Sequence, residues 1–158
     1  GQGHPEAGAA RGQIVAVIAG LDPVEFHRPR AGIEQHRLAV VRGVVNDDHP
    51  RSFVIDTGGE VISISRGTAN LLPPLTVRRV PIKVYGTSGW DDDAYLRPGT
   101  KLAFDQLLFR NHSVVVLNLH RPSALLGFQI GGIVGHSLLK DYRVTIDLSR
   151  SVMKLKKL

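Results

Sequence analysis

The sequence predicts a single all-β domain, and three observations support this. Val, Ile and Leu occur in short runs separated by Gly, Pro, Asn and Asp, which is typical of strands joined by turns. Long stretches with helical periodicity are scarce. The chain has 158 residues, of which 42% are hydrophobic and 22% are charged. This is enough to bury one core, and too little charge for a disordered chain.

The first half of the chain contains strand signals from residue 13 onward. Residues 13–19 can form a strand, whereas 21–33 contains two prolines and mixed charges and is interpreted as a connection. We expect residues 1–35 to be an N-terminal extension, either flexible or adding a strand. The other predicted elements of this half are strand 36–45, a turn at 46–50, strands 52–55 and 61–65, and one helical turn at 68–72.

The second half predicts further hairpins and one short helix. Glycine, asparagine and proline mark its turns. An apolar strand flanked by glycines at 131–135 leads into a helix of about two turns. The remaining predicted elements are strand 80–85, a bend at 86–89, a return strand at 94–96, strands 101–108 and 114–119 joined by a turn at 110–112, and a final hairpin of 143–148 and 151–155.

Composition excludes several classes of function. The net charge is +6, but the basic residues are spread along the chain, which indicates a solvated surface and not a nucleic-acid-binding face. The chain has no cysteine, its seven histidines lack the spacing of a zinc site, and no serine lies in a G-x-S-x-G motif. We therefore expect neither a metal nor a cofactor.

The cellular compartment is left open by the sequence. The longest apolar run near the start, Ile14 to Ala19, is much shorter than the ~20 residues of a membrane-spanning helix. A bacterial periplasmic or envelope protein and a cytoplasmic protein are both compatible with the composition, as is a membrane anchor outside the given residues.

Residues 53–60, FVIDTGGE, raise a physical question, because a run that resembles a buried strand ends on Asp56. Burying a lone carboxylate costs several kcal/mol or forces the group to take up a proton. Asp56 is therefore either the first residue of a turn, as in an inactive hairpin protein, or an acid held at a chosen pKa. A second pattern, Ile133-Val134-Gly135, precedes the short helix later in the chain.

The ordered pair of patterns, with a glycine-bounded hairpin between them, resembles the retropepsin-like aspartic proteases. The ending GGIVGHSLLKDYRVTIDLSRSVMKL resembles that of single-lobed bacterial members. The resemblance implies a single-lobe acid-protease β-barrel in residues 36–158, with one short C-terminal helix. It also implies an endopeptidase that hydrolyses peptide bonds through water activated by Asp56. Only one such motif is present, so the second carboxylate must come from a second copy in a homodimer.

The resemblance assigns roles to further residues. Thr57, Gly58 and Gly59 form the active-site loop, and Gly59 departs from the Ala or Ser that is usual in the family. Glu60 is expected to bind the substrate backbone and to pair with His136. The other expected substrate-binding residues are Tyr85, Gly86, Gly89 and Trp90 of a flap, and Ile133, Val134 and Gly135 beneath the loop.

Gly59 and the acidic run Asp91-Asp92-Asp93 after the flap keep other functions open. Consecutive side chains on an extended segment point to opposite faces, so the run is interpreted as a solvated loop and not as a cation site. As part of a flap it would favour basic substrates. The alternative function is a catalytically silent or latent module that dimerises or binds peptides. A nucleic-acid-binding domain is a third hypothesis, which a steep salt dependence would reveal.

Overall fold

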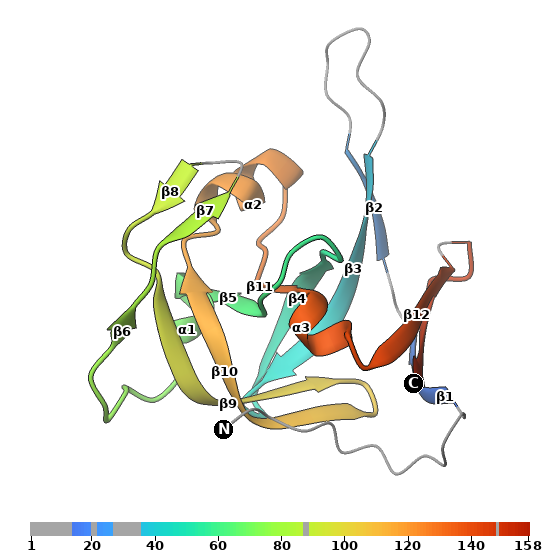
Figure 1. Cartoon of the computed structure of the whole chain (residues 1–158). Helices are drawn as coiled ribbons and strands as arrows, with labels where there is room; N and C mark the ends of the chain where they lie inside the picture. Colours follow the sequence, from blue (N-terminus) through green and yellow to red (C-terminus); the bar gives the residue numbers. More distant parts are fainter. Residues whose placement is uncertain (1–13, 20–21, 27–35, 87–88, 148) are drawn as a thin grey trace, which may run out of the picture.

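A computed structural model describes residues 14–19, 22–26, 36–86, 89–147 and 149–158, most of which lie in strands (Figure 1). The strands are β1 (Ile14–Ala19), β2 (Asp22–Phe26), β3 (His36–Val45), β4 (His49–Ile55), β5 (Ser63–Ser65), β6 (Val80–Pro81), β7 (Val84–Gly86), β8 (Gly89–Asp91), β9 (Tyr95–Phe104), β10 (Leu107–Leu117), β11 (Gly132–Val134), β12 (Tyr142–Asp147) and β13 (Val152–Lys157). The helices are α1 (Arg66–Ala69), α2 (His120–Leu126) and α3 (His136–Leu139).

The main sheet closes into a barrel. Its strand order is β2-β3-β4-β11-β5-β10-β9-β6, and an additional pairing of β3 with β9 closes the ring. Closure gives the strands of the ring a hydrogen-bonding neighbour on each side. The predicted all-β, single-lobe barrel is confirmed.

The last three residues of β4 are part of the buried hydrophobic core. Phe53, Val54 and Ile55 are all buried, and β4 has neighbours on both edges. The Phe53 ring packs edge-on against Phe104 with 5.1 Å between the ring centroids. Gly43 makes room for this pair, because a Cβ atom there would lie 2.6 Å from the Phe104 ring. The uninterrupted apolar run before Asp56 is thus explained by a strand that is covered on both faces.

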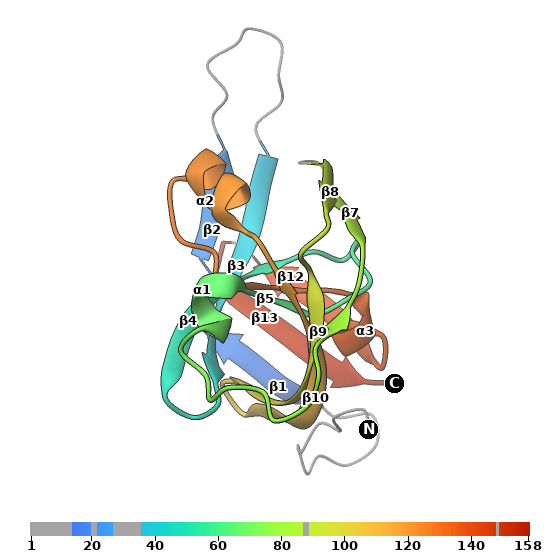
Figure 2. The same cartoon turned by 90° about the vertical axis from the view of Figure 1, so that its left-hand side faces the viewer.

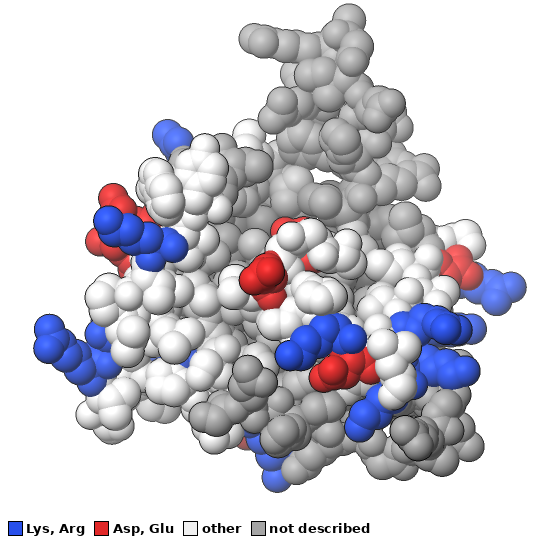
Figure 3. All heavy atoms as spheres, in the orientation of Figure 1, with Lys and Arg blue, Asp and Glu red and all other residues white. Residues whose placement is uncertain are grey.

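A second, three-stranded sheet joins the two ends of the described chain. Its order is β1-β13-β12, and both pairings are antiparallel. Met153 and Leu155 of β13 are buried, whereas Lys154 and Lys156, which alternate with them, are exposed. Figure 3 shows that Lys and Arg side chains gather over α3, β12 and β13. This part of the surface is more basic than the dispersed charges of the sequence indicate.

The predicted connection at 21–33 is wrong for residues 22–26. These residues form β2, which pairs antiparallel with β3 from Asp22↔Val40 to Phe26↔His36. Pro23 is tolerated because β2 is the edge strand of the main sheet, where a missing amide donor breaks no inner ladder. The rest of that segment, and residues 1–13, lie outside the described residues.

The predicted turn at 110–112 is also wrong. β9 and β10 meet at Asp105 and Gln106, where Asp105 has a φ of 54°. Asn111, with a φ of 50°, lies within β10 where the strand register shifts between Phe109 and His112. Such a shift is a β-bulge. Asparagine tolerates left-handed backbone in bulges and in turns, so its local signal does not distinguish the two.

The described residues form three short helices, where one short C-terminal helix and one helical turn were expected. α1 begins after Ser65, whose side chain accepts a hydrogen bond from the Thr68 amide. α2 lacks a side-chain cap, and its signals are Pro122 in the first turn and the left-handed Gly127 at its end. α3 is one turn and not two. In the described part of the chain, no helix is both long and apolar enough to cross a membrane.

Candidate active site

The strand that carries Asp56 lies beside the strand that carries the second motif. β11 is inserted between β4 and β5, parallel to β4 and antiparallel to β5. The last matched pair of β4 and β11 joins Ile55 to Val134. The Asp56 amide then donates to the Val134 carbonyl at 3.0 Å. Asp56 therefore stands at the end of this ladder, and the two motifs meet in neighbouring strands.

The Asp56 carboxylate is oriented by the backbone of its own turn. Its Oδ1 atom accepts hydrogen bonds from the amides of Gly58 and Gly59, both at 3.1 Å. Its Oδ2 atom has no donor among the residues that the structure describes. Asp56 and Thr57 are exposed in the single chain. The buried strand thus ends where the acid reaches solvent, so that no lone charge is buried.

Gly59 leaves space for the carboxylate. A Cβ atom at this position would lie 2.9 Å from Oδ2 of Asp56 and 3.3 Å from its Cγ. A Cβ atom on Gly58 would keep an ordinary distance of 3.5 Å from Oδ1. The departure from Ala or Ser at residue 59 is therefore matched by the position of the Asp56 side chain.

The loop after Asp56 crosses over Gly135 at very short range. A Cβ atom on Gly135 would lie 2.3 Å from the Val61 carbonyl oxygen and 2.8 Å from that of Gly59. The His136 amide donates to the Gly59 carbonyl at 2.6 Å, and the Ser137 amide to the Glu60 carbonyl at 2.8 Å. The first amides of α3 thus hold the loop from below. Gly135 thus lies directly beneath the loop, where a larger residue would meet the backbone.

Glu60 and His136 lie on neighbouring segments, as these backbone hydrogen bonds show. Both residues are exposed. Within the described residues no ion pair joins their side chains, and the expected contact stays a prediction. Val134 is buried and Ile133 is half-buried beneath the loop.

The expected flap forms a separate two-stranded hairpin. β7 and β8 pair with each other from Val84↔Asp91 to Gly86↔Gly89. Tyr85 and Trp90 are 69% and 64% exposed, and their ring centroids lie 5.1 Å apart. Figures 1 and 2 show the hairpin at the end of the barrel where the loop joins β4 to β5. Thr87 and Ser88, at the expected bend, lie outside the described residues.

The acidic run after the flap is only partly a solvated loop. Asp92 and Asp93 are exposed, but Asp91 is half-buried. Oδ1 of Asp91 accepts from the Arg66 guanidinium at 2.9 Å, and its Oδ2 accepts from the Asn118 amide at 2.9 Å. A hollow of about 480 Å³ beside Trp90 is lined by these acids together with Arg66, His120 and Arg121. The hollow thus carries charges of both signs, and the expected preference for basic substrates stays a prediction.

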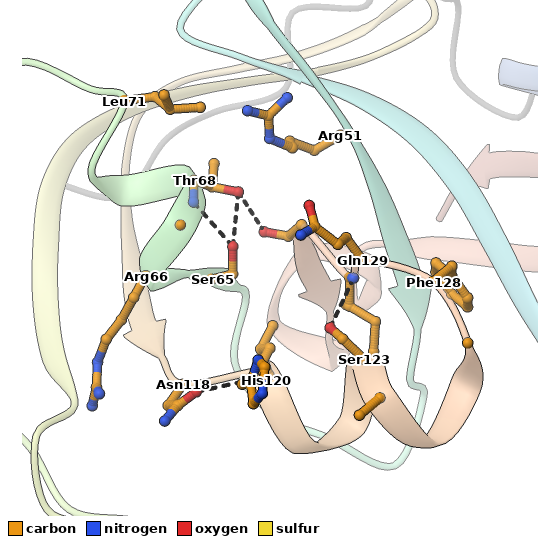
Figure 4. A pocket seen from close by; sticks show the side chains of 16 residues that line it. Arg51, Ser65, Arg66, Thr68, Leu71, Asn118, His120, Ser123, Phe128 and Gln129 are labelled. Carbon is orange, nitrogen blue, oxygen red and sulfur yellow. Dashed lines mark hydrogen bonds between the residues drawn. The ribbon is translucent and has the colours of Figure 1, made fainter.

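A larger cavity of about 670 Å³ lies elsewhere, between α1 and α2 (Figure 4). Asp56 does not line it. Its hydroxyl groups serve the fold: Ser65 and Thr68 bond to each other at 2.9 Å, and Ser123 accepts from the Ile130 amide at 3.0 Å. The described residues hold no group of His, Asp or Glu that could bind a metal ion.

Arg66 and Asn118 are the site-adjacent residues that the sequence reasoning missed. They are far from Asp91 in the chain, and each directly follows the end of a strand, Arg66 after β5 and Asn118 after β10. Only the pairing of β5 with β10 brings them together. A single sequence carries no local signal for such a contact.

Comparisons with known proteins agree with this geometry at the level of fold. No protein-family model matches the sequence, and no curated protein matches it. Among solved structures, the chain is similar to the crystal structure of a retropepsin-like aspartic protease from Rickettsia conorii. The TM-score is 0.54 at 19% sequence identity, over 99% of this chain and 96% of that chain. The chain therefore has a retropepsin-like fold.

Proposed function

We propose that this protein is an aspartic endopeptidase whose active site contains Asp56 from each of two copies of the chain. The observation that carries the proposal is the state of the Asp56 carboxylate. One of its oxygens is held by two backbone amides, while the other has no donor among the described residues. The acid is thus oriented and exposed, and each copy of the chain supplies one of the two carboxyl groups that the proposed site needs.

Two such carboxyl groups supply what peptide hydrolysis needs. Like charges a few ångströms apart cannot both ionise, so the pair shares one proton. The ionised carboxylate takes a proton from a water molecule, and the oxygen of that water bonds to the peptide carbon. The protonated carboxyl gives its proton to the carbonyl oxygen. The resulting tetrahedral diol collapses when the nitrogen takes the proton that came from water, a diol hydroxyl gives its proton to the other carboxylate, and the C–N bond breaks, so that the pair again holds one shared proton.

The neighbouring residues fit supporting roles in this reaction. The Gly59 and Glu60 carbonyls are occupied by amides of α3, so the loop is fixed before substrate binds. The Glu60 side chain is exposed next to the acid, where it can contact a peptide backbone. Tyr85 and Trp90 present exposed rings on a hairpin at the same end of the barrel. A peptide bound between loop and hairpin would contact both.

The test is cleavage of a peptide library between pH 4 and 7, combined with the molecular mass in solution. We expect Asp56→Asn to lower kcat by at least about a thousandfold, because the pair then lacks its base. Asp105→Asn is the matched control, since Asp105 lies in the β9–β10 turn with a φ of 54° that asparagine tolerates. The control variant is expected to keep full activity.

Two outcomes would contradict the proposal. Cleavage that survives Asp56→Asn removes Asp56 from the mechanism. A dimer that binds peptides without cleaving them at any pH supports the alternative, a catalytically silent binding module of the same fold. Gly59 is the observation that favours this alternative, because it departs from the residues usual in active family members.

A further inference from the structure

Asp91 connects the flap hairpin to the barrel through two hydrogen bonds and accepts a third within its own turn. Oδ1 accepts from the Arg66 guanidinium at 2.9 Å and from the Asp93 amide at 3.0 Å, and Oδ2 accepts from the Asn118 amide at 2.9 Å. The Asp91 side chain is 21% exposed. Such charge-assisted bonds are the stronger kind in proteins, more so where water is partly excluded.

Arg66 and Asn118 follow the ends of two neighbouring parallel strands. β5 and β10 are in register from Val115↔Ser63 to Leu117↔Ser65. The next residue of each strand is a partner of Asp91. One carboxylate therefore spans the ends of both strands. β5 also pairs with β11, and β11 carries the carbonyl that binds the Asp56 amide.

The hairpin has few other attachments. Among the described residues, β7 and β8 pair only with each other and belong to no larger sheet. On the β7 side, the Ile82 amide donates to the Ala94 carbonyl at 3.0 Å, just before the hairpin begins. The Tyr85 and Trp90 rings contact each other and are mostly exposed. Asp91 is thus the last residue of the hairpin and its side-chain link to the barrel.

We propose that Asp91 is a positioning residue that fixes the angle of the flap relative to the Asp56 loop. This inference rests on the proposed function for its kinetic consequence, but its structural consequence is independent of activity. Loss of the carboxylate leaves the Asn118 amide without its acceptor and leaves the Arg66 guanidinium with the longer, 4.0 Å ion pair to the exposed Asp93. The hairpin then swings about its base, and a bound peptide loses part of its cover while the catalytic loop is unchanged.

The experiment compares Asp91→Asn and Asp91→Ala with Asp92→Asn in the full chain. Asp92 is the matched control, because it is the adjacent acid and is exposed to solvent. Trp90 is the single tryptophan of the protein and lies next to Asp91, so its time-resolved fluorescence anisotropy reports hairpin motion without substrate. Hydrogen exchange of the Asn118 amide reports directly on its hydrogen bond to Asp91.

We expect faster and deeper decay of Trp90 anisotropy in both Asp91 variants, and Asn118 amide exchange about tenfold faster in Asp91→Ala. KM for a cleaved peptide rises about tenfold, the ratio expected for one lost charge-assisted hydrogen bond, while kcat changes less than KM. Asp92→Asn leaves all of these at wild-type values. Arg66→Gln provides a second disruption of the same bond if Asp91→Ala does not fold.

Wild-type anisotropy and exchange in the Asp91 variants would overturn the positioning role. A wild-type protein that cleaves no peptide would overturn the proposed function instead. In that case the anisotropy and the exchange still decide the role of Asp91.

Discussion

Two aromatic pairs in this molecule have the same distance between their ring centroids and lie in opposite environments. The Phe53 and Phe104 rings and the Tyr85 and Trp90 rings each have centroids 5.1 Å apart. The first pair is buried inside the barrel, and the second is exposed on the flap. Ring contact alone contributes about 1 kcal/mol, whereas burial of an aromatic side chain contributes several times as much. The first pair therefore stabilises the fold, and the second is available to a ligand.

The largest effect on stability is expected when a ring of the buried pair is removed. Phe53→Ala is expected to lower the free energy of unfolding by about 4 kcal/mol, because it removes transfer energy and leaves a cavity below the Asp56 strand. Chemical denaturation measures this value. A loss below about 1 kcal/mol would mean that the barrel collapses around the missing ring and that the pair does not hold it.

Tyr142 is a further buried ring, and it differs from Phe53 and Phe104 because it carries a hydroxyl group. Burial, with a smaller contribution from Asp141, raises the pKa of Tyr142 to about 12. The unfolded chain releases this proton near pH 10, so stability is full below pH 10 and falls as the pH rises toward 12. The loss approaches roughly 3 kcal/mol, which corresponds to a pKa difference of about two between the folded and unfolded chain.

The matching variant is Tyr142→Phe. The Tyr142 hydroxyl is buried and has no hydrogen-bond partner among the described residues. Removing it is expected to raise stability at neutral pH by about 1 kcal/mol and to abolish this part of the alkaline loss. Denaturation curves at pH 7 and pH 11 measure both effects. If Tyr142→Phe loses as much stability between pH 7 and pH 11 as the wild type does, another group titrates in this range.

The smallest effect on stability is expected for the exposed pair. Trp90→Ala should change the free energy of unfolding by no more than about 0.5 kcal/mol, as is usual for exposed side chains. For a cleaved peptide, KM should rise about tenfold, since one aromatic contact with the substrate is lost. A destabilisation as large as that of Phe53→Ala would contradict the division between structural and ligand-facing pairs.

The features that the sequence could predict depend on local contacts, and those that it could not predict depend on contacts between distant parts of the chain. The turn at Asp56 and the small residue at Gly135 are encoded in short patterns with a direct steric reason, and their crossing follows from the strand pairing. The turn at Asp105 was missed because Asn111 carries a stronger left-handed signal that serves a bulge.

Other misses depended on position in the sheet. Pro23 argues against a strand unless the strand lies at an edge, and the edge is known only once the sheet is assembled. The role of Asp91 requires two strand ends that are distant in the sequence. Its neighbours Asp92 and Asp93 look identical to it in the sequence and have different environments.

The pairing of β1 with β13 has a consequence for handling the protein. A protease that trimmed the chain after Ala19 would remove a whole strand and uncover the backbone donors and acceptors along one side of β13. Open strand edges invite pairing with another polypeptide. The position of such a cut would therefore decide whether preparations stay monodisperse or form mixed assemblies.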